Sequence, residues 1–169
     1  MKKILISLVS LLVFTSCVLH VYRFTSVNYN NSRISISAGL VNSEDEKSPV
    51  EYIGVSDVRS NVNTPHKVKI LSSTIKIIDS NNKEYIAKIN SNSGYIHIYK
   101  QGVVITDDFK AYIGKVQLDD GTIIDIPPLS FKKTVYVERY SVISDTINAG
   151  GRGKEIFSET VEDYKKQKK

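Results

Sequence analysis

Apolar and polar residues alternate with a period of two along most of the chain, and this alternation limits the fold more than any other feature. The clearest case is the pair of runs 111–118 and 122–126, joined by Asp119-Asp120-Gly121. Successive side chains of a strand point to opposite faces, and two alternating runs joined by an Asp-Gly turn are typical of a β-hairpin. The side chains expected on its inward face are Val116, Leu118, Ile124 and Ile126.

Similar runs, rich in the strand formers Ile, Val, Tyr and Thr, recur along the chain. Pro127 and Pro128 cannot donate ladder hydrogen bonds, so the second strand of the hairpin should end before them. No helical segment separates consecutive strands, which excludes parallel α/β folds. The pattern predicts an all-β antiparallel β-sandwich, with an immunoglobulin-like fold or a small barrel as the alternative. Besides the hairpin, we expect strands at residues 18–25, 33–38, 51–55, 66–70, 73–78, 84–89, 95–99, 103–106 and 131–143.

A helical period is found only near the C-terminus. Phe157, Val161 and Tyr164 are spaced so that they share one face of a helix. Acidic residues come early in this segment and lysines come late, as the helix dipole favours. We therefore expect one C-terminal α-helix at 154–168, after a glycine-rich linker at 148–153.

The start of the chain has a different character from the alternating runs. Lys2 and Lys3 precede the eleven largely apolar residues 4–14, and two small residues, Thr15 and Ser16, follow. A short positive segment, an apolar segment and a small-residue site together are typical of a secretory signal. The sequence therefore predicts that the chain is exported.

The signal ends in Phe14-Thr15-Ser16-Cys17, which resembles the lipobox of bacterial lipoproteins. The resemblance implies that Cys17 receives a lipid and becomes the new N-terminus. Cys17 is the only cysteine, so it has no partner for an internal disulfide. In a cell with two membranes, Val18 in place of the retention-associated Asp implies the outer membrane, facing the periplasm. Two alternatives stay open, an uncleaved anchor at 4–22, just long enough to span a bilayer, and a plain cleaved signal.

Removal of the signal, 1–16, leaves 153 residues, which is the size of one domain. We expect the β domain at 17–147, followed by the linker and the helix with its basic tail at 148–169. The net charge falls from +5 to +3 without the two lysines of the signal, and much of the remainder lies in the tail. This distribution does not indicate nucleic-acid binding.

Motifs of catalytic or metal-binding residues are absent from the sequence. There is no Gly-x-Ser-x-Gly motif, and the single cysteine is assigned to lipidation. The glycines before Lys154 do not form a phosphate-binding loop, because Glu155 stands where a magnesium-binding Ser or Thr belongs. His20, His66 and His97 are isolated, so a metal site would have to be assembled by the fold. We expect no enzyme activity, no cofactor and no metal.

Tyrosine is the residue type that indicates a binding surface, with ten tyrosines, five phenylalanines and no tryptophan. Tyr95, His97 and Tyr99 fall on one face of a predicted strand, and Tyr136 and Tyr140 on one face of another. If the aliphatic residues between them face the core, these rings face outward, and amphipathic rings suit interfaces. The alternative is that the rings lie flat on the outer face of the sheet and serve its stability.

Two functions remain open on this basis. The first is a non-catalytic envelope lipoprotein that binds another protein. Small basic lipoproteins with a β-rich domain look like immunity proteins that neutralise a toxin delivered into the periplasm, which is one concrete version. The second is a β-sandwich or barrel that holds a small ligand, a lipid or a glycan in an apolar cavity.

Overall fold

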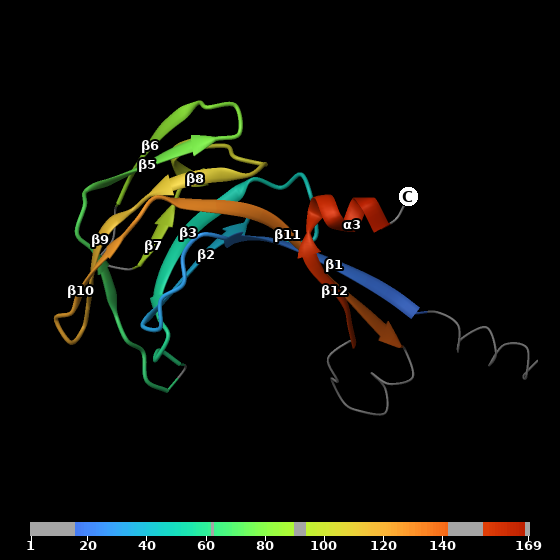
Figure 1. Cartoon of the computed structure of the whole chain (residues 1–169), viewed down its shortest axis with the longest axis horizontal. Coiled ribbons are helices and arrows are strands. Elements are labelled where there is room, and N and C mark those ends of the chain that lie inside the picture. The colour runs from blue at the N-terminus through green and yellow to red at the C-terminus, as the bar shows by residue number, and fades with distance from the viewer. Residues whose placement is uncertain (1–15, 62, 90–93, 142–153, 168–169) are drawn as a thin grey trace, which may run out of the picture. The chain divides into compact units, whose positions relative to one another are not determined.

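The structure is a computed structural model, shown in Figure 1. It describes residues 16–61, 63–89, 94–141 and 154–167. The chain forms two compact units: a large unit, Tyr22–Thr134, and a small unit that combines the chain up to Val21 with the chain from Val135 onward. Residues 1–15 of the predicted signal and the predicted linker lie outside the described residues, so the expected domain boundaries stay predictions.

Strands dominate the described residues. The larger sheet has the strand order β6-β5-β8-β11-β1-β2-β3-β7, with β12 paired to β11, and a second sheet has the order β10-β9-β4. A short 3-10 helix, η1 (Tyr99–Gln101), follows β7, and the helix α3 (Val161–Gln167) follows β12. No helix among the described residues is long and apolar enough to cross a membrane. The strands are β1 (Ser16–Ser26), β2 (Ile34–Leu40), β3 (Val50–Asp57), β4 (Val68–Ile70), β5 (Thr74–Asp79), β6 (Glu84–Lys88), β7 (Tyr95–His97), β8 (Phe109–Tyr112), β9 (Gly114–Leu118), β10 (Ile123–Ile126), β11 (Leu129–Ser141) and β12 (Lys154–Thr160).

The larger sheet curls into a nearly closed barrel in the large unit (Figure 1). This confirms the predicted all-β class and the predicted C-terminal helix. The sheet forms a barrel, which was the predicted alternative to a sandwich. Alternate side chains of each strand point inward, as the period of two requires. On β5, for example, Ile75 and Ile77 are buried. The core is almost entirely aliphatic, with Phe24, Phe109 and Phe131 as its aromatic members.

Gln101 joins the two edges of the curled sheet. Strands β6 and β7 are the first and last in the strand order. The Gln101 side-chain oxygen accepts a hydrogen bond from the Lys88 N–H at 2.7 Å. Its amide nitrogen donates to the carbonyl oxygens of Lys88 and His97, both at 2.9 Å. A side-chain amide carries one acceptor and two donors, so it serves here in place of a backbone ladder.

The predicted hairpin is confirmed, but its first strand is shorter than expected. Ile124 pairs with Val116, and β10 ends at Ile126, just before the two prolines. The expected single strand 111–118 is wrong, because the chain divides there into β8 and β9, which belong to different sheets. Gly114 starts β9 with a φ of 80°. This left-handed conformation favours glycine and turns the chain from one sheet to the other.

Two further expectations are corrected near β7. The strand expected at 95–99 stops at His97, and Tyr99 begins the 3-10 helix instead. The segment 103–106 is not a strand, although the Val50 N–H donates to the Ile105 carbonyl at 2.8 Å.

The helix expected at 154–168 is wrong in its first half. Residues 154–160 form β12, which pairs with β11, and only 161–167 are helical. Thr160 marks the change, because its hydroxyl oxygen accepts a hydrogen bond from the Asp163 N–H at 3.2 Å, as a helix N-cap does. In the small unit, the Tyr164 hydroxyl lies 2.6 Å from the His20 ring nitrogen, which anchors the helix to β1.

Candidate functional site

Three rings lie together on the outer side of β3 and β7, and we call Tyr52, Tyr95 and His97 the aromatic face. Tyr52 is directly opposite His97 across the two strands. The Tyr52 ring centroid is 5.4 Å from that of Tyr95 and 6.0 Å from that of His97, both in edge-to-face geometry. Such geometry is favourable between aromatic rings and adds to the stability of the pair.

Two glycines lie beneath the aromatic face. Gly39 of β2 is directly opposite Tyr52, and Gly54 of β3 is directly opposite Tyr95. A Cβ atom on Gly39 would lie 2.5 Å from the Tyr52 ring, and one on Gly54 would lie 2.8 Å from the Tyr95 ring. Each ring therefore covers the glycine of the neighbouring strand. Aromatic side chains that cover sheet glycines hold the register and shield the backbone.

The structure brings together only part of the predicted aromatic set. Tyr95 and His97 point outward as expected, and Tyr99 is 43% exposed, although it belongs to the 3-10 helix. Tyr136 is half-buried on the part of β11 that belongs to the small unit. The side chains of Tyr140 and Cys17 lie outside the described residues. Their predicted roles stay predictions.

Tyr52 is the member of the aromatic face that sequence reasoning missed. It lies on a predicted strand, between Glu51 and the buried Ile53. Its outward direction follows from the period of two, but its position beside the rings of β7 depends on strand pairing across about forty residues of chain.

A second cluster lies where the end of β3 approaches the turn of the β9–β10 hairpin. The carboxylates of Asp57 and Asp119 and the ring of His66 offer ligand atoms that all lie within 4.8 Å of one another. Three such groups are enough for a divalent metal ion in principle. The sequence showed no ligand spacing for His66, because these residues come from three separate segments that only the fold brings together.

Arg59 explains this cluster without a metal ion. Asp57 is fully buried, and its carboxylate accepts hydrogen bonds from the Arg59 side chain at 3.0 Å and 2.6 Å. The guanidinium group supplies the positive charge that a buried carboxylate needs. The His66 ring nitrogen lies 2.6 Å from the Asp119 carboxylate. We interpret the cluster as an ion-pair network that fastens the loop after β3 to the hairpin turn.

The pH dependence of the free energy of unfolding should reveal whether this ion-pair network stabilises the protein. Hydrogen bonds from the Arg59 side chain lower the pKa of Asp57 from 3.8 to about 2, although burial alone would raise it. A folded-state pKa below the unfolded value means that the carboxylate stabilises the fold above about pH 4, and that this contribution is lost as the pH falls towards about 2. Asp57→Asn should lower the free energy of unfolding by about 1 to 2 kcal/mol at neutral pH.

Urea denaturation across this pH range measures the effect. Asp57→Asn should change less in stability between about pH 4 and pH 2 than the parent protein, because the titrating group is gone. Asp125→Asn, on the exposed side of β10, is the matched control and should keep the parental pH profile. The same profile in Asp57→Asn and the parent would contradict the network.

Lys133 is a buried amine, a kind of group that enzymes use as a nucleophile. Its ammonium group donates hydrogen bonds to the carbonyl oxygens of Glu46, at 2.6 Å, and Thr106. It also lies 5.1 Å from the centroid of the Phe24 ring, a cation–π distance. These contacts tie two loops to β11, so we assign Lys133 a structural role.

Comparison with protein-family models, with curated proteins and with solved structures finds no match to this chain.

Proposed function

We propose that this protein is a non-catalytic binding module of the cell envelope that holds a protein partner against its aromatic face. The observation that carries the proposal is the ring cluster of Tyr52, Tyr95 and His97 on the outside of the barrel, where Tyr95 is 45% exposed. Tyrosine and histidine rings offer apolar area together with a polar group, which is the chemistry that protein interfaces favour.

The packing of the Tyr52 and Tyr95 rings on glycines also supports the binding of a protein partner. Tyr52 and Tyr95 rest on glycines, so their rings are already ordered before any partner arrives. Binding then costs little side-chain entropy, because each tyrosine has few rotatable bonds and its rotamer is already restrained. The two roles weighed for these rings are thus compatible, because Tyr95 covers Gly54 and still keeps 45% of its surface exposed.

The envelope location is part of the same proposal and is supported by sequence alone. A basic start, an apolar run and a terminal Thr-Ser-Cys support export and a lipid on Cys17. Such an anchor would hold the module at a membrane, facing the periplasm in a cell with two membranes. Neutralisation of a toxin is the narrower version of this function, and the identity of the captured partner tests it.

The test starts with partners captured from the membrane fraction by the native lipoprotein and identified by mass spectrometry. The affinity of the identified partner is then measured for the parent and for the variant His97→Glu. The His97 side chain covers no glycine among the described contacts, so the thermal midpoint should fall only by the small loss of its edge-to-face contact with Tyr52. The affinity should fall about tenfold or more, as it does when central interface residues are changed.

Two further variants complete the test. Ile86→Glu changes an exposed side chain on β6 and should leave the affinity at the parental value. Tyr95→Ala should weaken binding and also lower stability by about 1 kcal/mol, because it uncovers Gly54. Parental affinity in both His97→Glu and Tyr95→Ala would place the interface elsewhere and refute the proposal.

A further inference from the structure

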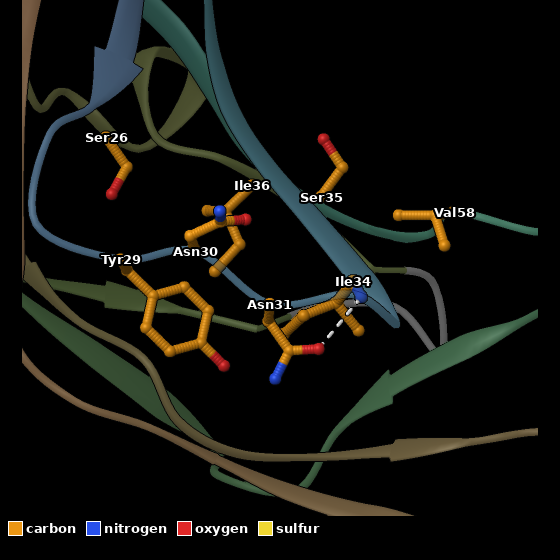
Figure 2. A pocket seen from close by; sticks show the side chains of 8 residues that line it. All are labelled: Ser26, Tyr29, Asn30, Asn31, Ile34, Ser35, Ile36 and Val58. Atoms are coloured by element: carbon orange, nitrogen blue, oxygen red, sulfur yellow. Dashed lines mark hydrogen bonds between the residues drawn. The ribbon is translucent and has the colours of Figure 1, made fainter.

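A hollow of about 270 Å³ lies beside the loop that joins β1 to β2 in the large unit. It is close in size to the smallest common small-molecule pockets, of about 300 Å³. Figure 2 shows the side chains around it, which come from the end of β1, the loop, the first residues of β2 and the residue after β3. The lining residues are Ser26, Tyr29, Asn30, Asn31, Ile34, Ser35, Ile36 and Val58.

The chemistry of this lining is polar but uncharged. Two serines and two asparagines provide hydroxyl and carboxamide groups, and Tyr29 adds a phenol ring. Ile34, Ile36 and Val58 provide apolar surface beside them. None of the eight lining residues carries a charge, so the hollow has no counter-charge for an anion or a cation.

Ser26 borders the hollow, but its hydroxyl is closed to solvent. Its oxygen is buried and has no hydrogen-bond partner within the described part of the chain. Figure 2 shows it pointing toward Tyr29 and Asn30. Buried polar atoms without a protein partner are rare in folded proteins, and an ordered water or ion commonly accounts for them.

The loop around the hollow is held in place by its own hydrogen bonds. The Asn31 side-chain oxygen accepts from the backbone N–H groups of Arg33, at 2.8 Å, and Ile34, at 3.3 Å. Asn28 ties the loop to the start of β11, because its side-chain oxygen accepts from the Ser130 N–H at 2.7 Å. The hollow is therefore formed in advance, and the Asn31 amide nitrogen remains to donate to a ligand.

We propose that this hollow binds one sugar residue of a neutral saccharide. Sugar hydroxyls both donate and accept hydrogen bonds, which matches serine hydroxyls and asparagine carboxamides. The C–H face of a sugar ring matches the tyrosine ring and the aliphatic side chains. A lipid chain would leave the polar lining unpaired, and a charged ligand would have no partner. This site uses residues separate from the aromatic face and goes beyond the proposed protein partner.

Ligand-observed saturation-transfer NMR tests the site with the full-length protein in a detergent that has no sugar headgroup. The probes are triacetylchitotriose and maltotriose, two neutral trisaccharides. At least one should give a saturable signal, and Ser35→Ala and Asn30→Ala should each weaken its binding about tenfold, which corresponds to about 1.4 kcal/mol. The thermal midpoint of Ser35→Ala should stay parental, because the Ser35 side chain is exposed.

Ser37→Ala is the matched control, since Ser37 is exposed on the same strand as Ser35 but does not line the hollow. It should bind the probe as the parent does. The proposal is overturned if neither trisaccharide gives a saturable signal. It is also overturned if the probe binds the two hollow variants as tightly as it binds the parent. Both results leave the protein-partner proposal untouched, because that proposal depends on other residues.

Discussion

The variant Val116→Asp is expected to be unfolded in buffer at room temperature. Val116 is fully buried on β9, opposite Ile70 of β4 and Ile124 of β10. An aspartate at this position would place a carboxylate among apolar side chains, at a cost of several kcal/mol. Loss of the buried valine adds to this cost, and a whole domain is stable by only about 5 to 15 kcal/mol. Circular dichroism should show the loss of the β signal and of the cooperative thermal transition.

The neighbouring residues on the same hairpin provide the control. Ile123 is 56% exposed and lies on the other face of β10, so Ile123→Asp should change stability by about 0.5 kcal/mol or less. Ile124 is half-buried and should give an intermediate loss. A shift of register by one residue would exchange the inward and outward faces. A Val116→Asp protein that melts like the parent would therefore show that β9 faces the other way.

The β-rich fold was predictable because its signals are local. Alternation and turn residues identified the hairpin around Gly121 and its end at the prolines, and the structure confirms both. The corner at Gly114 was missed, since one glycine in an alternating run is compatible with a continuous strand. The start of α3 was missed for a different reason. Phe157, Val161 and Tyr164 have helical spacing, but pairing with β11 and the cap at Thr160 override it.

The candidate sites were less predictable because they depend on contacts between distant segments. The outward direction of Tyr95 and His97 follows from the alternation along one strand, and the structure confirms it. The position of Tyr52 beside them depends on the pairing of β3 with β7. Asp57 and Asp119 are about sixty residues apart in the chain, and the polar loops that hold them carry no ligand spacing. Sequence patterns therefore identified single faces, and only the fold shows which faces meet.

Closure of the barrel also depends on contacts between distant segments of the chain. A substitution that disrupts this closure is the second variant for which we expect a large loss of stability. Gln101→Glu should lower the free energy of unfolding by about 2 to 3 kcal/mol. The amide nitrogen of Gln101 donates to the carbonyl oxygens of Lys88 and His97. A carboxylate cannot donate, so the variant loses both bonds and places a negative charge against two carbonyl oxygens. The edges at β6 and β7 then lose the side chain that joins them.

Urea denaturation and amide hydrogen exchange measure this effect together. In the parent, the Gln101 side-chain oxygen protects the Lys88 N–H, so exchange at Lys88 should become faster when the edge of β6 opens. Gln117→Glu makes the same chemical change on β9, away from the two edges, and should cost much less. Parental stability and slow exchange at Lys88 in Gln101→Glu would mean that core packing alone closes the barrel. Lower stability with unchanged exchange at Lys88 would place the effect of Gln101 on the β7 side, at the His97 carbonyl oxygen.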